Sequence, residues 1–173
     1  MVIVIMGVSG SGKTVVGESL ATQLGWTFED ADNWHPPANI EKMRSGVPLT
    51  DDDRRQWILS LRDAIQKWIA DERDVALACS ALRERYRVVL READPNGESL
   101  RFVYLKGTYE EIDRRLRSRA GHFMPESLLK SQFAALEEPG PAEALTVDVN
   151  QPVSEIVAAI MQGLSLQRSS DRM

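Results

Sequence analysis

A segment near the amino terminus has the residue types and spacing of a loop that binds nucleotide phosphates. Residues 7–14 fit the pattern G-x-x-x-x-G-K-[S/T] and directly follow an apolar run, residues 2–6. Glycine adopts backbone conformations that let successive N–H groups turn toward a phosphate. Lys13 supplies a cation for the β- and γ-phosphates, and the Thr14 hydroxyl is a ligand for Mg²⁺. The residues predicted to bind a nucleoside triphosphate here are Gly7, Val8, Ser9, Gly10, Ser11, Gly12, Lys13 and Thr14.

The sequence on either side of this segment favours a true phosphate loop over a glycine-rich turn that matches by chance. The apolar run before it is typical of a buried strand. Val16, Leu20 and Leu24 after it have the spacing of an amphipathic helix. Strand, loop and helix in this order form the context in which the motif binds phosphate.

A second polar cluster follows the next predicted strand, residues 26–29. Residues 30–37 read Asp-Ala-Asp-Asn-Trp-His-Pro-Pro. Asp32 is our candidate catalytic carboxylate, because it can accept a proton from an attacking hydroxyl or hold a Mg²⁺-bound water. Turn formation before the two prolines is the alternative, and for Asp30 the two interpretations stay open. His35 either closes this turn or, with its polar neighbours, binds a polyhydroxylated ligand.

Two arginines are candidates for binding an anionic acceptor. Arg54 lies one turn into a helix that begins at Thr50, where it can bind a carboxylate. Arg87 lies, with Arg83, in the arginine-rich helix that follows the strand ending at Cys79. Most arginines of that second helix are expected to face solvent, which is the alternative for Arg87 as well.

A third group of arginines is predicted to lie in a lid over the nucleotide. A helix that begins at Thr108 carries Arg115 and Arg119 one turn apart on one face and leads into a glycine-containing loop. Such arginines can neutralise a phosphoryl group during transfer. A solvated charged helix is the alternative, and we accept it for the other arginines there. Pro152, at the end of residues 148–152, follows the last predicted strand, where an adenine ring could rest.

Length and composition set limits on the class of protein. The chain has 173 residues, 43% of them hydrophobic, which suits one domain over residues 1–173. A net charge of −5 argues against a nucleic-acid-binding surface. Cys79 is the only cysteine, so no internal disulfide forms, and with two histidines the chain has too few ligands for a zinc cluster. The short apolar run at the start is neither a secretion signal nor a membrane span, which predicts a cytoplasmic protein.

The periodicity predicts an α/β fold of the P-loop NTPase type, with three layers, a parallel sheet of about five strands and a helical lid. The predicted strands are residues 2–6, 26–29, 74–79, 100–105 and 145–149. The long helix from Thr50 places Trp57 and Trp68 at core spacing rather than as a platform for ligand. The strand that ends at Cys79 lacks the aspartate that often binds Mg²⁺ in such folds. Mg²⁺ must then rely on Thr14, the phosphates, water and Asp32.

Blocks of residues along nearly the whole chain resemble one known family. They are Met6 to Lys13, Asp32 with His35-Pro36, Asn39 to Met43, Gly46 with Pro48-Leu49, Asp51 to Arg54, Trp57, Cys79 to Leu82, Tyr86-Arg87, Tyr104-Leu105, Gly121 to Phe123, Gln132-Phe133 and Leu136-Glu137. In these blocks the chain is similar to the small phosphate-loop gluconate kinases, which resemble shikimate and nucleoside monophosphate kinases in fold. Three positions depart from the family pattern: Thr50, Arg83 and Ala120, of which Ala120 is expected to weaken contacts of the lid.

The resemblance implies a function and several site roles. It implies an ATP-dependent carbohydrate kinase that phosphorylates D-gluconate at its C6 hydroxyl and releases 6-phospho-D-gluconate and ADP. The arginines and the glycine-containing loop predict a lid at about residues 117–128, with Arg119 and His122 closing over the acceptor, and the polar terminus predicts a frayed tail at residues 167–173. The resemblance also implies a homodimer, whereas the net charge and the short apolar run at the start predict that the protein binds neither nucleic acid nor membrane. The expected catalytic residues are Lys13, Asp32 and Arg119, the ATP contacts beyond the loop are Arg115, Arg119 and Pro152, and the acceptor contacts are Asp32, His35, Arg54, Arg87 and His122.

Two other functions stay open at this point. A kinase of the same fold could act on another small acceptor, such as a different sugar acid, shikimate or a nucleoside monophosphate. A regulator could bind ATP without catalysis, although such a protein would not need a loop lysine, a carboxylate and an arginine-rich lid together.

Overall fold

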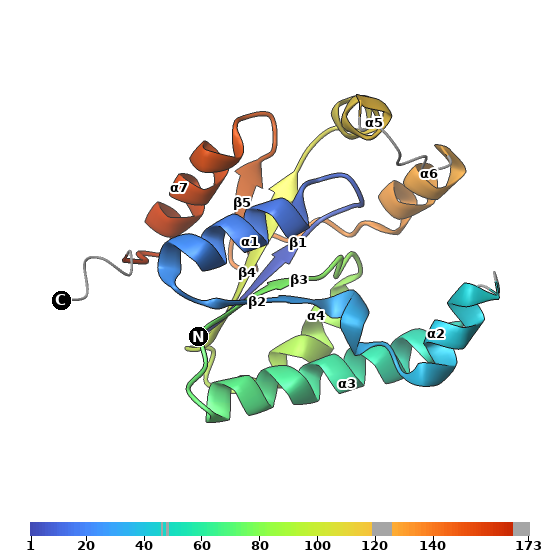
Figure 1. The fold of residues 1–173 in the computed structure, drawn as a ribbon, viewed down its shortest axis with the longest axis horizontal. Helices are drawn as coiled ribbons and strands as arrows, with labels where there is room; N and C mark the ends of the chain where they lie inside the picture. The colour runs from blue at the N-terminus through green and yellow to red at the C-terminus, as the bar shows by residue number, and fades with distance from the viewer. Residues whose placement is uncertain (46, 48, 119–125, 168–173) are drawn as a thin grey trace.

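The computed structural model describes residues 1–45, 47, 49–118 and 126–167. Over these residues the strands form a single parallel sheet of five strands in the order β2-β3-β1-β4-β5 (Figure 1). In chain order they are β1 (Val2–Met6), β2 (Thr27–Asp30), β3 (Val75–Ala78), β4 (Leu100–Lys106) and β5 (Leu145–Asp148). β1 lies in the middle, with Val2 opposite Val75 of β3 and Leu100 of β4. The predicted parallel α/β architecture is therefore confirmed.

Helices cover both faces of the sheet and make the outer two of three layers. α1 (Lys13–Leu24) and α7 (Val153–Gly163) cover one face, whereas α3 (Asp51–Ala70) and α4 (Glu84–Arg91) cover the other (Figure 1). The remaining helices lie toward the carboxyl ends of the strands (Figure 1). They are the 3₁₀ helix η1 (Ala31–Trp34), α2 (Pro37–Arg44), α5 (Tyr109–Ser118) and α6 (Glu126–Ala135). Among the described helices none is long and apolar enough to cross a membrane.

The core explains why β1 reads as an unbroken apolar run. Ile3 and Ile5 pack with Leu20 in the cluster beneath α1 and α7, whereas Val2 and Val4 belong to the cluster beneath α3 and α4. Both sets of side chains are fully buried. A strand that is covered on both faces has no solvent side on which a polar residue could alternate. This rigid central strand delivers the segment that follows it, residues 7–14, to the carboxyl edge of the sheet.

Side-chain caps fix where two helices begin. Thr50 and Asp53 form the predicted capping box at α3, in which each side chain accepts from the other residue's backbone N–H. Thr108 and Glu111 form the second predicted box before α5, with bonds of 2.8 and 3.3 Å. Each box satisfies backbone donors that a helix start would otherwise leave unpaired.

Arg87 is a buried charge that joins distant parts of the chain. Its side chain is only 1% exposed, and its Nε donates to Oε1 of Glu143 over 2.6 Å. Its Nη1 donates to the backbone oxygens of Ala81 and Leu82 over 3.0 and 3.1 Å. Burial alone would favour protonation of Glu143, but hydrogen bonds from Arg87 and Arg91 outweigh it and lower the pKa of Glu143. Arg87 therefore holds the segment after β3 against the segment that leads into β5.

We expect Arg87→Met to lower the free energy of unfolding by about 3–5 kcal/mol, because it leaves the Glu143 carboxylate without its buried partner. Urea unfolding monitored by tryptophan fluorescence measures this. Since the pKa of Glu143 is lowered in the folded state, its stabilising contribution is present above the ordinary carboxyl pKa. That contribution is lost as the pH falls through the lowered value. The variant should lose the share of this pH dependence that Arg87 contributes, while the contact of Arg91 with Glu143 keeps the rest.

The matched control is Lys106→Met. Lys106 also forms an ion pair, at 2.7 Å to Glu138, but both side chains are about half exposed. Solvent-exposed pairs contribute roughly 0–1 kcal/mol, so this variant should unfold at nearly the wild-type urea concentration. Equal losses of unfolding free energy in the two variants would contradict the structural role assigned to Arg87.

Candidate active site

The phosphate loop lines a polar cavity of about 220 Å³ at the carboxyl edge of the sheet. We call this the donor cavity. Gly12 caps α1 in the left-handed region, with φ of 97°, and so turns the chain into the helix. At Gly7 a Cβ atom would lie 2.8 Å from Oγ of Ser11 and 3.0 Å from the backbone oxygen of Leu105, so the loop can close only with glycine there. The residues that line the donor cavity are Ser9, Gly10, Gly12, Lys13, Thr14, Val15, Asp30, Asp32, Ala78, Cys79 and Ser80.

The residues of the donor cavity suit a triphosphate with Mg²⁺. Lys13 and Thr14 begin α1, so the positive end of the helix dipole adds to the Lys13 ammonium. The Lys13 Nζ donates to the backbone oxygen of Val8 over 3.0 Å, which arches it over the loop. Burial lowers the pKa of Lys13, and the charges of Asp32 and Asp30 oppose that shift. The Oγ of Ser11 is buried and has no hydrogen-bond partner among the described residues, but Ser11 does not itself line the donor cavity.

Asp30 and Asp32 reach the donor cavity although β2 is not beside β1. β3 lies between these strands, but it ends at Ala78 and is followed by Cys79 and Ser80, three small residues that all line the same cavity. Oδ1 of Asp30 accepts from the Asp32 backbone N–H over 3.0 Å and caps η1. Asp30 therefore has the turn role that the sequence left open. Partial desolvation and the charge of Asp30 raise the pKa of Asp32, while His35 and Lys13 oppose the shift.

A second cavity, of about 330 Å³, adjoins the first, and we call it the acceptor cavity. Ser80 at the end of β3 lines both. The acceptor cavity has polar and aromatic walls from four separate stretches of the chain. Its lining residues are His35, Leu49, Arg54, Trp57, Ser80, Ala81, Leu82, Arg83, Tyr86, Leu128, Ser131, Gln132 and Ala135.

The structure brings three of the predicted acceptor residues together and separates one. His35 and Arg54 line the acceptor cavity, and Asp32 lines the donor cavity next to it. Arg87 lines neither, because its guanidinium is buried and bonded to Glu143. The prediction of a direct acceptor contact for Arg87 therefore does not match its placement. Its neighbour Arg83 lines the acceptor cavity instead.

Trp57 has a different environment from that predicted. Trp68 is 3% exposed and lies in the core, as its spacing indicated. Trp57 packs against that core but also lines the acceptor cavity, where its ring stacks on His35 with centroids 4.6 Å apart. Its Nε1 donates to the backbone oxygen of Ala31 over 2.9 Å. Trp57 thus serves as both core residue and cavity wall.

The predicted nucleotide contacts outside the loop lie near the end of β5 where the structure describes them. Arg115 on α5 donates a hydrogen bond to the backbone oxygen of Val149. Pro152 is the residue before α7. Arg119 and His122 lie outside the described residues, as do lid residues 119–125. The contacts predicted for these four residues with ATP or acceptor stay predictions.

Gln132 of α6 connects the two cavities, a role that sequence reasoning missed. Its Oε1 accepts from the Ser9 backbone N–H over 2.6 Å, and its Nε2 lies 2.9 Å from the Ser9 Oγ. Gln132 itself lines the acceptor cavity, whereas Ser9 lines the donor cavity. The only sequence signal was the Gln132-Phe133 block of the family resemblance, which carries no information on its partner.

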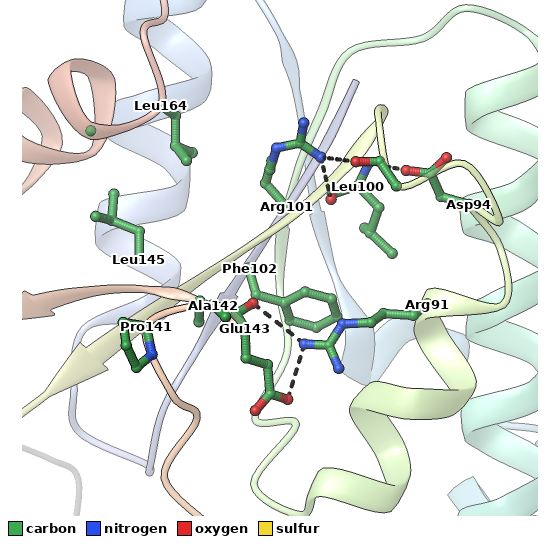
Figure 2. Close-up of a pocket in the computed structure, with 13 residues that line it drawn as sticks. Arg91, Asp94, Leu100, Arg101, Phe102, Pro141, Ala142, Glu143, Leu145 and Leu164 are labelled. Carbon is green, nitrogen blue, oxygen red and sulfur yellow. Dashed lines mark hydrogen bonds and ion pairs between the residues drawn. The ribbon is translucent and has the colours of Figure 1, made fainter.

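A larger cavity, of about 510 Å³, lies at the opposite edge of the sheet, where β4 and β5 begin. Its charged groups bond to neighbouring protein groups (Figure 2). Arg91 contacts Oε1 of Glu143 at 3.0 Å and lies over the Phe102 ring. Arg101 donates to the backbone oxygens of Gly97 and Leu100. Far from the phosphate loop and with its arginines engaged, this cavity is not the reactive site.

Comparisons with known proteins agree with this geometry. The family described as "AAA domain" matches residues 2–139. A "Probable gluconokinase" of Xenopus tropicalis is 46% identical over 92% of this chain and 91% of its own length. The crystal structure of a gluconokinase from Sinorhizobium meliloti 1021 is 47% identical and has a TM-score of 0.81, covering 94% of this chain and 90% of that one. A shikimate kinase from Aquifex aeolicus vf5, 19% identical with a TM-score of 0.60 over 95% and 96% of the two chains, shares the fold.

We expect Gln132→Leu to weaken binding of a nonhydrolysable ATP analogue with Mg²⁺ about tenfold, measured by calorimetry. The variant removes two hydrogen bonds that fix the loop, each worth roughly 0.5–1.5 kcal/mol, and about 1.4 kcal/mol corresponds to tenfold in affinity. Ser9→Ala removes only the hydroxyl contact and keeps the backbone bond, so its loss should be smaller. Tighter binding by Gln132→Leu would show that Gln132 competes with the phosphates instead of positioning the loop.

Proposed function

Because the chain belongs to the gluconokinase family, we propose that it transfers the γ-phosphoryl group of ATP to the C6 hydroxyl of D-gluconate. It is an ATP-dependent carbohydrate kinase, and the products are 6-phospho-D-gluconate and ADP. The observation that supports this most directly is the junction at Ser80, where a phosphate-loop cavity meets a cavity lined by His35 and Arg54. Donor and acceptor bound in these cavities would meet beside Asp32.

The donor side is assigned to the loop and the start of α1. The ammonium of Lys13 and the backbone N–H groups of the loop hold the β- and γ-phosphates, and the Thr14 hydroxyl binds Mg²⁺. Bound Mg²⁺ offsets negative charge on the transferring group. Cys79 stands at the strand end where an aspartate often binds the metal. Burial raises the pKa of Cys79 to about 12, so its thiol stays neutral.

The acceptor side is assigned to residues that suit a sugar acid. The Arg54 side chain lies on the cavity wall, is 44% exposed and, among the described residues, has one ion-pair contact, at 3.6 Å to Asp51, so it is available for a carboxylate. Arg83 adds a second cation from the start of α4. His35 supplies a polar edge for hydroxyl groups. A cavity lined by two cations and by the polar side chains of His35 and Gln132 suits a ligand with one carboxylate and several hydroxyls.

Catalysis on this arrangement consists mainly of positioning and charge neutralisation. Asp32 accepts the proton of the attacking C6 hydroxyl as the O–P bond forms and the bond from the γ-phosphorus to the leaving oxygen of ADP breaks. Its raised pKa makes it a better proton acceptor than an ordinary aspartate. Lys13 stabilises charge on the phosphates throughout the transfer.

Further parts of the proposal rest on the sequence, and the homodimer among them rests on the family resemblance. They are a single kinase domain over residues 1–173, a lid at about residues 117–128 whose Arg119 and His122 close over the acceptor, and ATP contacts from Arg115 and Pro152. A homodimer and a cytoplasmic location complete the proposal, with neither nucleic acid nor membrane as a partner.

The proposal is tested by ADP release with Mg²⁺ and ATP against a panel of acceptors. The panel contains D-gluconate, related sugar acids, shikimate, nucleoside monophosphates and a reaction without acceptor. We expect strong stimulation by gluconate alone. Lys13→Ala should reduce that rate by about 10²–10³ or more while the protein stays folded, because one preorganised charge at the transferring group is lost.

The panel also distinguishes the competing functions. Stimulation by shikimate or a nucleotide in place of gluconate would keep the kinase mechanism and replace the acceptor. ATP binding without stimulation by any acceptor would favour a regulator. Near-normal turnover in folded Lys13→Ala would refute the role of the phosphate loop.

We expect Asp32→Asn to reduce gluconate-dependent turnover by about 10²–10⁴, the usual contribution of a general base, while ATP still binds. In the wild type, kcat/KM for gluconate should fall as the pH decreases through the pKa of Asp32. Because this pKa is raised, the fall should occur at a higher pH than for an ordinary aspartate.

Asp30→Asn is the matched control. It keeps an oxygen that can accept from the Asp32 backbone N–H but removes the charge that raises the pKa of Asp32. Activity should persist, and the acid limb of the pH profile should move to lower pH. A profile that is unchanged in both variants would remove Asp32 from the mechanism.

A further inference from the structure

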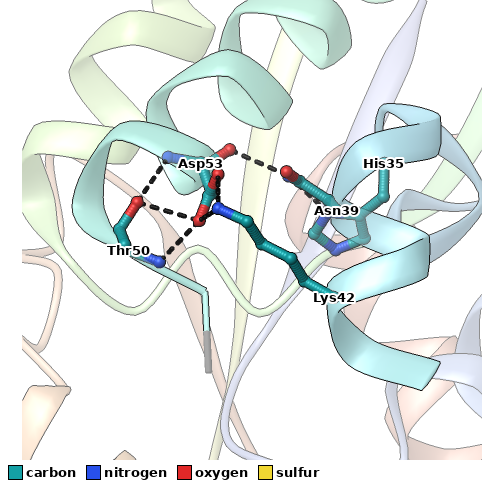
Figure 3. A network of polar contacts seen from close by, with 5 residues as sticks. All are labelled: His35, Asn39, Lys42, Thr50 and Asp53. Atoms are coloured by element: carbon teal, nitrogen blue, oxygen red, sulfur yellow. Dashed lines mark hydrogen bonds and ion pairs between the residues drawn. The ribbon is translucent and has the colours of Figure 1, made fainter. Parts of the chain in front are cut away.

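His35 is held on two sides in the wall of the acceptor cavity. It follows η1 directly, and its ring stacks on Trp57 with an interplanar angle of 14°. The side-chain nitrogen of Asn39, on the next helix α2, lies 3.4 Å from His35 Nδ1 (Figure 3). Asn39 is 3% exposed. A buried amide beside one ring nitrogen leaves Nε2 as the nitrogen free to meet a ligand.

The second contact of Asn39 fixes which way its amide points. Nδ2 of Asn39 donates to the backbone oxygen of Asp53 over 2.9 Å. A backbone carbonyl only accepts hydrogen bonds, so the group facing it must be the NH₂ and not the amide oxygen. The other hydrogen of this NH₂ is then available to His35. Nδ1 of His35 must accept it, and an accepting Nδ1 carries no proton.

Several hydrogen bonds hold Asp53 in place, and they thereby fix the backbone oxygen to which Asn39 donates. The Asp53 carboxylate accepts from the Lys42 ammonium at 2.7 and 2.8 Å and from Thr50, whose side chain caps α3 in return (Figure 3). Hydrogen bonds from Lys42 and Thr50 lower the pKa of Asp53 to about 2, so it stays anionic. This network anchors α2 to the first turn of α3 and places the Asp53 carbonyl beside Asn39.

We propose that Asn39 is a positioning residue that holds His35 as the neutral Nε2–H tautomer, so that His35 donates a hydrogen bond to an oxygen of the acceptor. The proposal rests on the proposed function of the cavity as the acceptor site. A protonated imidazole would place a second N–H against the N–H of Asn39, and the neutral Nδ1–H tautomer would do the same. The buried amide therefore disfavours both other forms of the ring.

The surroundings of His35 favour the neutral ring as well. Burial lowers the pKa of His35, and Asp32 partly opposes the shift. The other charged groups on the cavity wall are Arg54 and Arg83, which disfavour a further cation. A neutral donor binds a hydroxyl or carboxylate oxygen without adding positive charge beside Asp32. The cavity would then select acceptors in two ways. Arg54 would bind the carboxylate, and His35 would donate a hydrogen bond to an oxygen elsewhere on the acceptor.

The decisive measurement is ¹⁵N NMR of the imidazole rings at about pH 7.5, above the ordinary histidine pKa. The chain contains two histidines, His35 and His122, so loss of one signal set in His35→Gln assigns the spectrum. We expect an unprotonated Nδ1 and a protonated Nε2 for His35 in the wild type. A protonated Nδ1 would overturn the proposal, whether or not any variant folds.

Variants test the role of Asn39 in function. The carboxylate of Asn39→Asp cannot donate to Nδ1, so His35 should shift to the neutral Nδ1–H tautomer. Its Nε2 then has no proton to donate, and KM for gluconate should rise about tenfold, the value of one hydrogen bond. KM for ATP should change little. Lys42→Met is the matched control, because it weakens the same anchor between α2 and α3 but keeps the Asn39 amide. It should leave the His35 tautomer unchanged.

The outcomes separate this proposal from the proposed function. If His35 keeps its wild-type tautomer in Asn39→Asp, Asn39 does not set it. If the tautomer switches but KM for gluconate does not change, His35 is not the donor to the acceptor. If no acceptor stimulates the wild type, the kinase proposal fails, whereas the NMR spectra still decide the role of Asn39.

Discussion

The buried guanidinium of Arg87 is the interaction on which the arrangement of the two cavities depends. It binds the Ala81 and Leu82 carbonyls while paired with Glu143. Ala81 has a φ of 41°, unusual for a residue with a side chain, so this segment needs external support. The Leu82 carbonyl also accepts from the Glu137 backbone N–H over 2.9 Å. Burial of an arginine is costly, and here it fixes a wall of the acceptor cavity with partners from beyond α6.

Small side chains at the end of β3 are the second requirement. β3 separates the strand before the phosphate loop from the strand before Asp32. A large residue at Ala78, Cys79 or Ser80 would fill the space that these residues share with Lys13 and Asp32 in the donor cavity. An aspartate at Cys79 would add a third carboxylate beside Asp30 and Asp32 and would further raise the pKa of Asp32. A neutral thiol at this position leaves the charge balance of the cavity to Lys13 and the two carboxylates.

Features that depend on neighbours in sequence could be predicted, and features that depend on distant partners could not. The phosphate loop and the Thr50–Asp53 capping box lie within a few residues, and their spacing was sufficient. Arg87 has the spacing of a helix face, but helical spacing does not reveal that Glu143 lies opposite. Gln132 contacts Ser9 across 123 residues, and no local pattern carries that information. Trp57 was predicted as core because periodicity shows that a side chain faces inward, but not that a cavity lies there.

The same difference between local and distant contacts explains why the sequence alone identified the phosphate donor, whereas only family resemblance identified the acceptor. The donor cavity is lined mainly by one continuous loop and the start of the helix that follows it, so a short motif describes it. The acceptor cavity is assembled from the residue after η1, the start of α3, the segment from the end of β3 into α4, and α6, and side chains provide most of its polar groups. These can change one at a time while the sheet and the loop stay the same. A shikimate kinase with 19% identity and the same fold is consistent with such a scaffold. Acceptor specificity therefore depends on how the side chains of separate elements are oriented, as Asn39 orients His35.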